Sequence, residues 1–389
     1  MGICKCHHSS GTVDCSNVAL HKVPPYLPCQ TKTLYLNGNK IENIANSDFQ
    51  CMRSLEFLSL QNNLITGLDE DIFTELENLK VLNLRNNRIS FVASRSFRHV
   101  NKTLEDLDLS KNEWHMLDED PFLEPMHNLR ELKLSENGIK TLRGESFSGV
   151  TGLKILSLES NVINSLETDG YALHGLTSLE ELYLGSNFFS AMPSQGAFQA
   201  CQDSLTILSM PGQIRLNELP KLSFPNLKIL NMSHCSLTLI ENNTLSDCPN
   251  LETLDLSDNK IQRMQSKSLS GLVALKYLYL SLNFFAYLPY SALAEVSRSL
   301  QSLHADYLGL SEVGNFSTLF GDGFLGNLTY LSLGYNGITN IDQNSFFNNL
   351  KKLQILKLSY TQLRDVPKQA MMNLSSLEEF VFDENPITQ

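Results

Sequence analysis

The sequence predicts an α/β solenoid: a curved horseshoe of about 15 stacked repeats, with a parallel sheet on its concave face and a cysteine-rich cap at its N-terminus. Two observations lead to this prediction. A short leucine motif recurs along nearly the whole chain in steps of 22 to 28 residues, and the first 30 residues lack this motif but contain four cysteines. The length of 389 residues would otherwise suggest two or three compact domains, and a sequence repeat overrides that estimate.

The repeat has the form Leu-x-x-Leu-x-Leu-x-x-Asn, and an early variant of it begins at Thr31. The later units begin at Leu55, Leu79, Leu104, Leu129, Leu153, Leu179, Leu205, Leu227, Leu251, Leu275, Leu300, Leu328, Leu353 and Leu377. Together the 15 units cover residues 31–389, which leaves residues 1–30 as the cap. This period is the signature of a leucine-rich repeat solenoid, in which each unit adds one strand and stacking of the units encloses the core.

Each residue type in the unit has a structural reason. In the unit that begins at Leu55, alternation along the strand should turn Leu58 and Leu60 inward and leave Phe57 and Ser59 on the concave face. The asparagine of the motif should pair with buried backbone groups of neighbouring coils. It stands at Asn39, Asn63, Asn87, Asn112, Asn137, Asn161, Asn187, Asn259, Asn283, Asn336 and Asn385, and is replaced at Gln213, Cys235, Leu308 and Thr361. A column of phenylalanines should pack inside the convex side: Phe49, Phe73, Phe97, Phe122, Phe147, Phe198 and Phe346.

Composition and motifs exclude several functions. Forty-two acidic and 30 basic residues give a net charge of −12, and no run of Lys or Arg outlines a phosphate-binding stripe. We therefore predict no nucleic-acid partner and no anionic membrane partner. No apolar stretch reaches the roughly 18 residues that a membrane span requires. No H-E-x-x-H, phosphate-loop or G-x-S-x-G motif is present, so we predict a protein without enzymatic activity, cofactor or metal.

The first 30 residues resemble the N-terminal cysteine cap of extracellular leucine-rich repeat proteins. The similarity lies in Cys-Lys-Cys at 4–6, Val-Asp-Cys-Ser at 13–16 and the Leu- and Pro-containing segment 20–28. The pairing of that family implies a disulfide between Cys4 and Cys15 and leaves Cys6 without its usual partner. Cys29 is the obvious substitute, and Cys51 is another candidate. A disulfide cap of this kind covers the open edge of the first coil and implies an extracellular protein.

The solenoid as a whole resembles a Toll-like receptor ectodomain, through its 24-residue unit with a downstream phenylalanine, its cap and its irregular units in mid-chain. The resemblance implies a protein or microbial ligand that bridges two ectodomains into a homodimer or heterodimer. It also implies a role in innate immunity, at the cell surface or in endosomes, with membrane attachment only through a part that follows residue 389. The alternative is a secreted adhesion, guidance or matrix protein that binds another protein in its concave face.

Aromatic side chains give the first candidate binding site. Tyrosine supplies contact area at low entropic cost, so Tyr277 and Tyr279 should anchor a ligand on the concave face, with His304 and Tyr330 on the following strands. A second candidate is an acidic group that would suit a basic partner surface, formed by Asp106, Asp108, Glu131 and Glu181.

The remaining signals concern modification and irregular units. Six N-x-S/T sequons are candidate glycosylation sites, at Asn101, Asn231, Asn242, Asn315, Asn327 and Asn373. The longest unit, which begins at Leu300, contains a glycine-rich insertion at residues 311–324 that should project from one edge and contribute to binding. Cys201, Cys235 and Cys248 should be buried free thiols.

Overall fold

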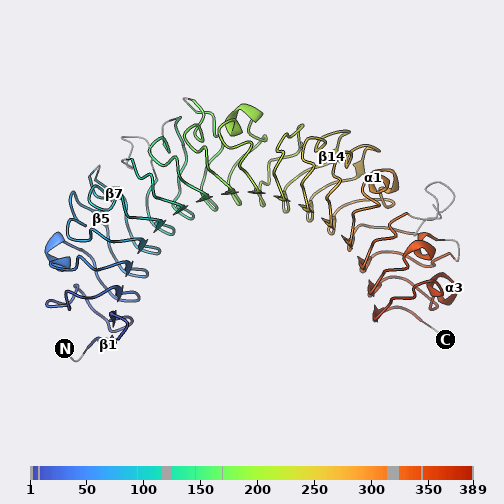
Figure 1. Ribbon diagram of the computed structural model, residues 1–389. Coiled ribbons are helices and arrows are strands. Elements are labelled where there is room, and N and C mark those ends of the chain that lie inside the picture. Colours follow the sequence, from blue (N-terminus) through green and yellow to red (C-terminus); the bar gives the residue numbers. More distant parts are fainter. Residues whose placement is uncertain are drawn as a thin grey trace. The chain divides into compact units, whose positions relative to one another are not determined.

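The computed structural model describes residues 3–7, 9–93, 95–115, 125–144, 146–168, 170–312, 324–342 and 345–387. The chain forms two compact units. The first comprises Met1–Phe188 and Pro193–Leu205, and the second comprises Phe189–Met192 and Thr206–Gln389. In each unit, short coils are stacked so that their strands lie side by side along one side of the stack (Figure 1).

The main sheet of the first unit begins in the cap. Its strands are β1 (Lys5–His7), β2 (Thr12–Asp14), β3 (Thr33–Tyr35), β4 (Phe57–Ser59), β6 (Val81–Asn83), β8 (Asp106–Asp108), β9 (Glu131–Lys133), β10 (Ile155–Ser157) and β11 (Glu181–Tyr183). β1 is antiparallel to β2, and each later strand is parallel to the one before it. A second, smaller pairing joins β5 (Gly67–Leu68) to β7 (Phe91–Val92).

The second unit repeats this architecture with parallel strands throughout. Its main sheet contains β12 (Ile207–Ser209), β13 (Ile229–Asn231), β15 (Thr253–Asp255), β17 (Tyr277–Tyr279), β18 (Ser302–His304), β19 (Tyr330–Ser332), β20 (Ile355–Lys357) and β21 (Glu379–Val381). β14 (Leu239–Ile240) pairs separately with β16 (Arg263–Met264). In both units a three-residue strand begins two residues after the first position of every predicted repeat, which confirms the repeat and its register.

Alternation along each strand separates core from surface as predicted. Leu58 and Leu60 are fully buried, and burial of each such leucine contributes about 1.5–3 kcal/mol to stability. Phe57 faces outward and is partly exposed. Ser59 faces the same way but is only 4% exposed, between the larger Tyr35 and Asn83 that flank it in register.

The motif asparagines connect neighbouring coils. Asn63 donates through Nδ2 to the carbonyls of Leu36 and Leu60, at 3.0 and 2.9 Å, and its Oδ1 accepts from the N–H of Ile41 at 3.0 Å. The amide therefore satisfies buried backbone groups of two successive coils, as predicted.

Three of the four replacements keep part of this role. Cys235 donates through Sγ to the carbonyl of Met210, and Thr361 donates to the carbonyl of Leu358. Gln213, which has no exposed surface, accepts from the N–H of Phe189 at 3.3 Å. At the fourth replacement, Leu308, the side chain has no polar atom to contribute, and the asparagine of the next unit accepts the backbone N–H of Leu308.

On the side opposite the main sheet, several coils carry a phenylalanine of the predicted column or a short helix. Phe49, Phe73 and Phe97 are buried, with ring centroids 6.5 and 6.0 Å apart, and Phe147, Phe198 and Phe346 are also buried. Phe122 lies outside the described residues. Among the described residues the helices are η1 (Asn46–Phe49), η2 (Gln195–Phe198), η3 (Phe346–Asn349), α1 (Tyr290–Glu295) and α3 (Lys368–Met371). Within the described part of the chain, none of the helices is long and apolar enough to cross a membrane.

Candidate functional site

Three of the four predicted ligand-binding residues form one stack on the outward face of the second unit's main sheet. Tyr279 and His304 lie side by side in parallel register, with ring centroids 4.4 Å apart and planes at 20°. The ring of Tyr330, one strand further along, lies 4.5 Å from that of His304, with planes at 28°. We call Tyr279, His304 and Tyr330 the sheet-face stack.

Polar neighbours hold the sheet-face stack in place. The Oγ of Ser302 lies 3.2 Å from Nε2 of His304, and the Nζ of Lys357 lies 5.6 Å from the ring centroid of Tyr330. Burial lowers the pKa of His304 and raises that of Tyr279, so both rings are neutral near pH 7. The stack is therefore a largely uncharged aromatic surface with a cation at one end.

Tyr277 stands apart from this stack. It is 40% exposed and lies opposite Thr253 and Ser302 in register, in the same row of the sheet face as Tyr330 but with Ser302 between them. The structure thus brings together three of the four predicted residues and leaves the fourth as a separate contact point.

The predicted acidic group lies on the sheet face of the first unit. Asp106 and Glu131 are direct neighbours in register, and Asp108 lies opposite Lys133. Burial, followed by repulsion from Glu131, raises the pKa of Asp106 to about 6. Lys133 contacts Glu131 at 2.7 Å, so part of the acidic charge is already neutralised within the protein.

The fourth acidic residue has its own partner. The hydroxyl of Tyr183 donates to Glu181 at 2.7 Å, and burial together with this bond raises the pKa of Tyr183 to about 12. Three of the four predicted acids are therefore adjacent, while Glu181 lies two strands beyond Glu131.

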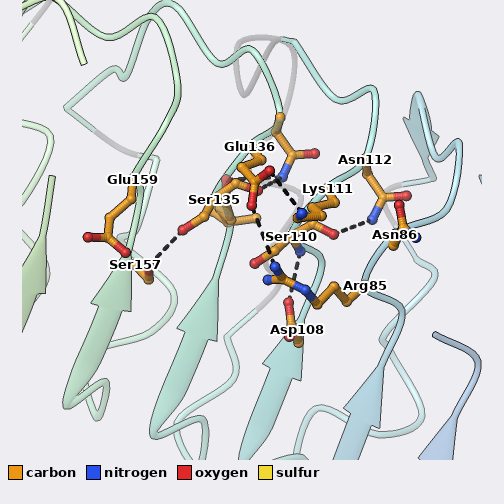
Figure 2. Close-up of polar contacts among 12 residues, drawn as sticks. Arg85, Asn86, Asp108, Ser110, Lys111, Asn112, Ser135, Glu136, Ser157 and Glu159 are labelled. Carbon is orange, nitrogen blue, oxygen red and sulfur yellow. Dashed lines mark hydrogen bonds and ion pairs between the residues drawn. The ribbon is translucent and has the colours of Figure 1, made fainter. Parts of the chain in front are cut away.

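At the C-terminal ends of the same strands, Glu136 joins two cations from two preceding coils. Its carboxylate lies 3.5 Å from Arg85 and 3.2 Å from Lys111 (Figure 2). Ser135 and Ser157 are hydrogen bonded at 2.7 Å in the same view. These contacts are partly exposed and link successive coils, so we interpret this edge as structural.

A second aromatic group, not predicted from the sequence, lies in the second unit. Tyr307, Tyr335 and Tyr360 stack on one another, with centroid distances of 4.1 and 4.4 Å and planes within 11° and 9°. Each directly precedes the asparagine position of its repeat. The sequence feature that could have revealed this group is therefore a tyrosine at the same place in three consecutive units. We call these three residues the tyrosine ladder.

The cysteines confirm one expected disulfide and correct another. Cys4 and Cys15 form a disulfide, as the cap resemblance implied. Cys29 is bonded to Cys51, not to Cys6, and Cys6 is a free, exposed thiol. The pairing of Cys6 with Cys29 was therefore wrong; Cys29 and Cys51 have Cα atoms only 5.2 Å apart, within disulfide reach. Cys201, Cys235 and Cys248 are free and buried, as predicted.

The described sequons occupy different surroundings, and their glycosylation remains a prediction. Asn242 and Asn373 are exposed, and Asn101 and Asn327 are partly exposed. Asn231 lies on β13, where its Oδ1 accepts from the N–H and hydroxyl of Ser233 at 2.9 and 2.8 Å. Asn315 and most of the predicted insertion at 311–324 lie outside the described residues.

Comparison with curated proteins finds podocan of Mus musculus, 28% identical over 96% of this chain and 63% of podocan. Decorin of Oryctolagus cuniculus is 30% identical over 63% of this chain and 59% of decorin. The chain thus spans less than two thirds of the length of these relatives.

Solved structures with the same fold include a leucine-rich repeat protein of Leptospira interrogans, with a TM-score of 0.75 and 25% identity over 96% of this chain and 90% of that one. The mouse RP105/MD-1 complex matches with a TM-score of 0.61 and 25% identity, over 98% of this chain and 67% of the other. The Drosophila Toll–Spatzle complex matches in fold, with a TM-score of 0.63 and 21% identity over 89% and 44% of the two chains.

The family model described as leucine rich repeat matches residues 58–113, 102–163, 127–189, 225–285 and 326–387. The matches include more than half of the chain and coincide with the repeats seen in the structure. The chain therefore belongs to the leucine-rich repeat family and, with its cap disulfides and these relatives, is a leucine-rich repeat protein of the extracellular type.

Proposed function

We propose that this chain is an extracellular, non-enzymatic recognition domain that binds a protein ligand on the sheet face of its second unit. The sheet-face stack is the observation on which the proposal rests. Tyrosine is enriched among the residues that dominate protein interfaces, and here two tyrosines and a neutral histidine are already stacked.

The backbone supports the same proposal. β17, β18 and β19 are held in parallel register on both sides, so the stack is fixed before a ligand arrives. A preorganised surface loses little conformational entropy on binding, and more of the contact energy then appears as affinity.

The sequence relatives favour a matrix or adhesion protein as the biological setting. Podocan and decorin are leucine-rich repeat proteins of the extracellular matrix, and podocan aligns with 96% of this chain. A Toll-like ectodomain that dimerises around a ligand is the second candidate, because the RP105/MD-1 complex covers 98% of the chain. The full transcript distinguishes the two: a Toll/interleukin-receptor domain after a membrane helix supports the receptor, and a secreted product supports the matrix protein.

Binding itself is tested with an array of secreted, matrix and cell-surface proteins. The chain, the variant Tyr279→Ser/Tyr330→Ser and the control Tyr287→Ser are applied in parallel; Tyr287 is 63% exposed in the same unit but lies outside the stack. We expect the double variant to lose at least about tenfold affinity for a bound protein, or about 1.4 kcal/mol, while the control binds normally. Equal affinity of all three proteins would exclude the sheet-face stack as the site.

A further inference from the structure

The tyrosine ladder lies outside the proposed sheet-face site and presents a second aromatic surface. Tyr307, Tyr335 and Tyr360 are 48%, 42% and 46% exposed, although their rings cover one another. Leu282, at the equivalent place in the preceding coil, is 47% exposed. Four successive coils of the second unit therefore place a large apolar side chain in solvent along one edge.

The backbone at these positions makes the choice of residue unusual. All four residues have positive φ values, from 52° to 59°, in the left-handed region that disfavours bulky side chains. The equivalent positions of the first unit have the same backbone but hold glycine or polar residues: Gly38, Asn62, Asn86, Lys111, Glu136, Ser160 and Ser186. Folding of the repeat therefore requires this backbone conformation but not the aromatic rings. A residue type that its backbone conformation disfavours is expected mainly at functional sites.

The ladder is rigidly held by the coil beneath it. The N–H groups of Tyr307, Tyr335 and Tyr360 donate to carbonyls of the next coil, at 3.1, 2.9 and 3.0 Å. The rings are thereby kept at the spacing of successive strands, which makes the edge a preorganised contact surface.

Carboxylates surround the ladder. Asp306 directly precedes Tyr307 and accepts from the N–H of Gly334 at 2.7 Å, and Asp383 and Glu384 are exposed in the coil after Tyr360. Burial, then the neighbouring phenols and Asp306, raise the pKa of Tyr307. Glu384, then Tyr335, burial and Asp383, raise the pKa of Tyr360, so both phenols remain neutral donors. The surface combines aromatic edges and hydroxyl groups with negative charge.

We propose that the tyrosine ladder and its flanking carboxylates form a second docking edge, which takes a protein segment that presents arginine or lysine among apolar side chains. Apolar parts of that segment contact the ring edges, and its cations pair with Asp383 and Glu384. A second copy of this chain is disfavoured as the occupant, because its net charge of −12 brings like charges together.

Selection of short random peptides on phage tests the proposal. The intact chain is immobilised, and an excess of the soluble variant Tyr307→Asn/Tyr335→Asn/Tyr360→Asn absorbs peptides that bind elsewhere. Asparagine is chosen because Asn62 and Asn86 occupy the equivalent position with the same backbone. Selected peptides are then measured on this variant, on Asp383→Asn/Glu384→Gln and on Tyr279→Ser/Tyr330→Ser.

The proposal predicts selected peptides enriched in arginine or lysine. They should lose at least about tenfold affinity on the ladder variant, lose several-fold on the carboxylate variant and bind the sheet-face variant normally. The carboxylate variant changes only exposed side chains, so its peptide affinity remains informative even if the ladder variant unfolds at a lower temperature. Any of three results would overturn the second docking edge. The selected peptides are not enriched in arginine or lysine, no peptide prefers the intact chain, or the peptides lose as much affinity on the sheet-face variant as on the ladder variant. None of these outcomes alters the separate test of the sheet-face site.

Discussion

Replacement of Asn259 by alanine tests how the coils are held together. Asn259 is 4% exposed; its Oδ1 accepts from the N–H of Leu237 at 3.0 Å, and its Nδ2 donates to the carbonyls of Met232 and Leu256, at 2.8 and 3.1 Å. The Leu256 carbonyl also accepts from Asn283 at 2.9 Å and keeps that bond in the variant. The variant therefore deprives two buried backbone groups, the Leu237 N–H and the Met232 carbonyl, of the partner that Asn259 supplies.

The expected destabilisation follows from these two groups. A buried backbone group that loses its partner costs about 1–3 kcal/mol, and two such groups cost about 2–6 kcal/mol. Single substitutions rarely exceed about 4 kcal/mol, so we expect the free energy of unfolding to fall by about 2–4 kcal/mol. Urea unfolding monitored by circular dichroism measures this change.

The neighbouring residue gives a matched control. Asp258 has a left-handed backbone with φ of 49°, and its half-exposed carboxylate contacts His234 on the surface. Asp258→Asn keeps a residue suited to that backbone and changes only a surface contact with His234, worth about 0–1 kcal/mol. Equal losses of stability for Asn259→Ala and Asp258→Asn would refute the assignment of the asparagine as a buried bridge between coils.

Three further predictions concern cysteines and charge. Alkylation of the native protein should modify Cys6 and spare Cys201, Cys235 and Cys248. Burial raises the pKa values of the latter three thiols to about 12, 11 and 11, which leaves them unreactive. Modification of a buried thiol before the protein unfolds would contradict this prediction. Peptide mapping without reductant should recover Cys4 linked to Cys15 and Cys29 linked to Cys51, and a Cys6–Cys29 peptide would exclude that pairing. The pKa of Asp106 in the folded protein is about 6, above its ordinary 3.8. Protonated Asp106 therefore stabilises the fold near pH 4, and this contribution is lost as the pH rises through about 6. Asp106→Asn should therefore melt above the parent protein near pH 7.5 and close to it near pH 4, and a pH-independent difference would show that Asp106 is not responsible.

Much of the fold could be predicted because it depends on local periodicity. Residues such as Leu58 and Asn63 occupy positions that the coil geometry dictates, so one repeat predicts the next. Gln213 shows the limit of this reasoning. Its longer amide reaches the N–H of Phe189 and partly replaces the asparagine, which a comparison of residue types alone did not indicate.

The candidate sites depended on features that periodicity does not encode. Strand alternation correctly placed Tyr279, His304 and Tyr330 on one face, but ring contacts between coils depend on side-chain conformations. The pairing of Cys29 with Cys51 depends on how the cap meets the first repeat, and the sequence had suggested each of these cysteines only as a partner for Cys6. The tyrosine ladder was missed because its backbone position is normally occupied by small or polar residues, so the pattern of inward and outward strand residues did not include it.

Hydroxyl-radical footprinting of a complex tests the central claim, recognition by the sheet face of the second unit, most directly. The complex is formed with a protein recovered from the array, and side-chain oxidation is compared with that of the free chain. Binding at the sheet-face stack predicts protection of Tyr279, His304 and Tyr330, with unchanged oxidation of Tyr287 and of Tyr171, which is 43% exposed in the first unit. Unchanged oxidation of the three stacked residues, together with protection elsewhere on the chain, would contradict the proposed function.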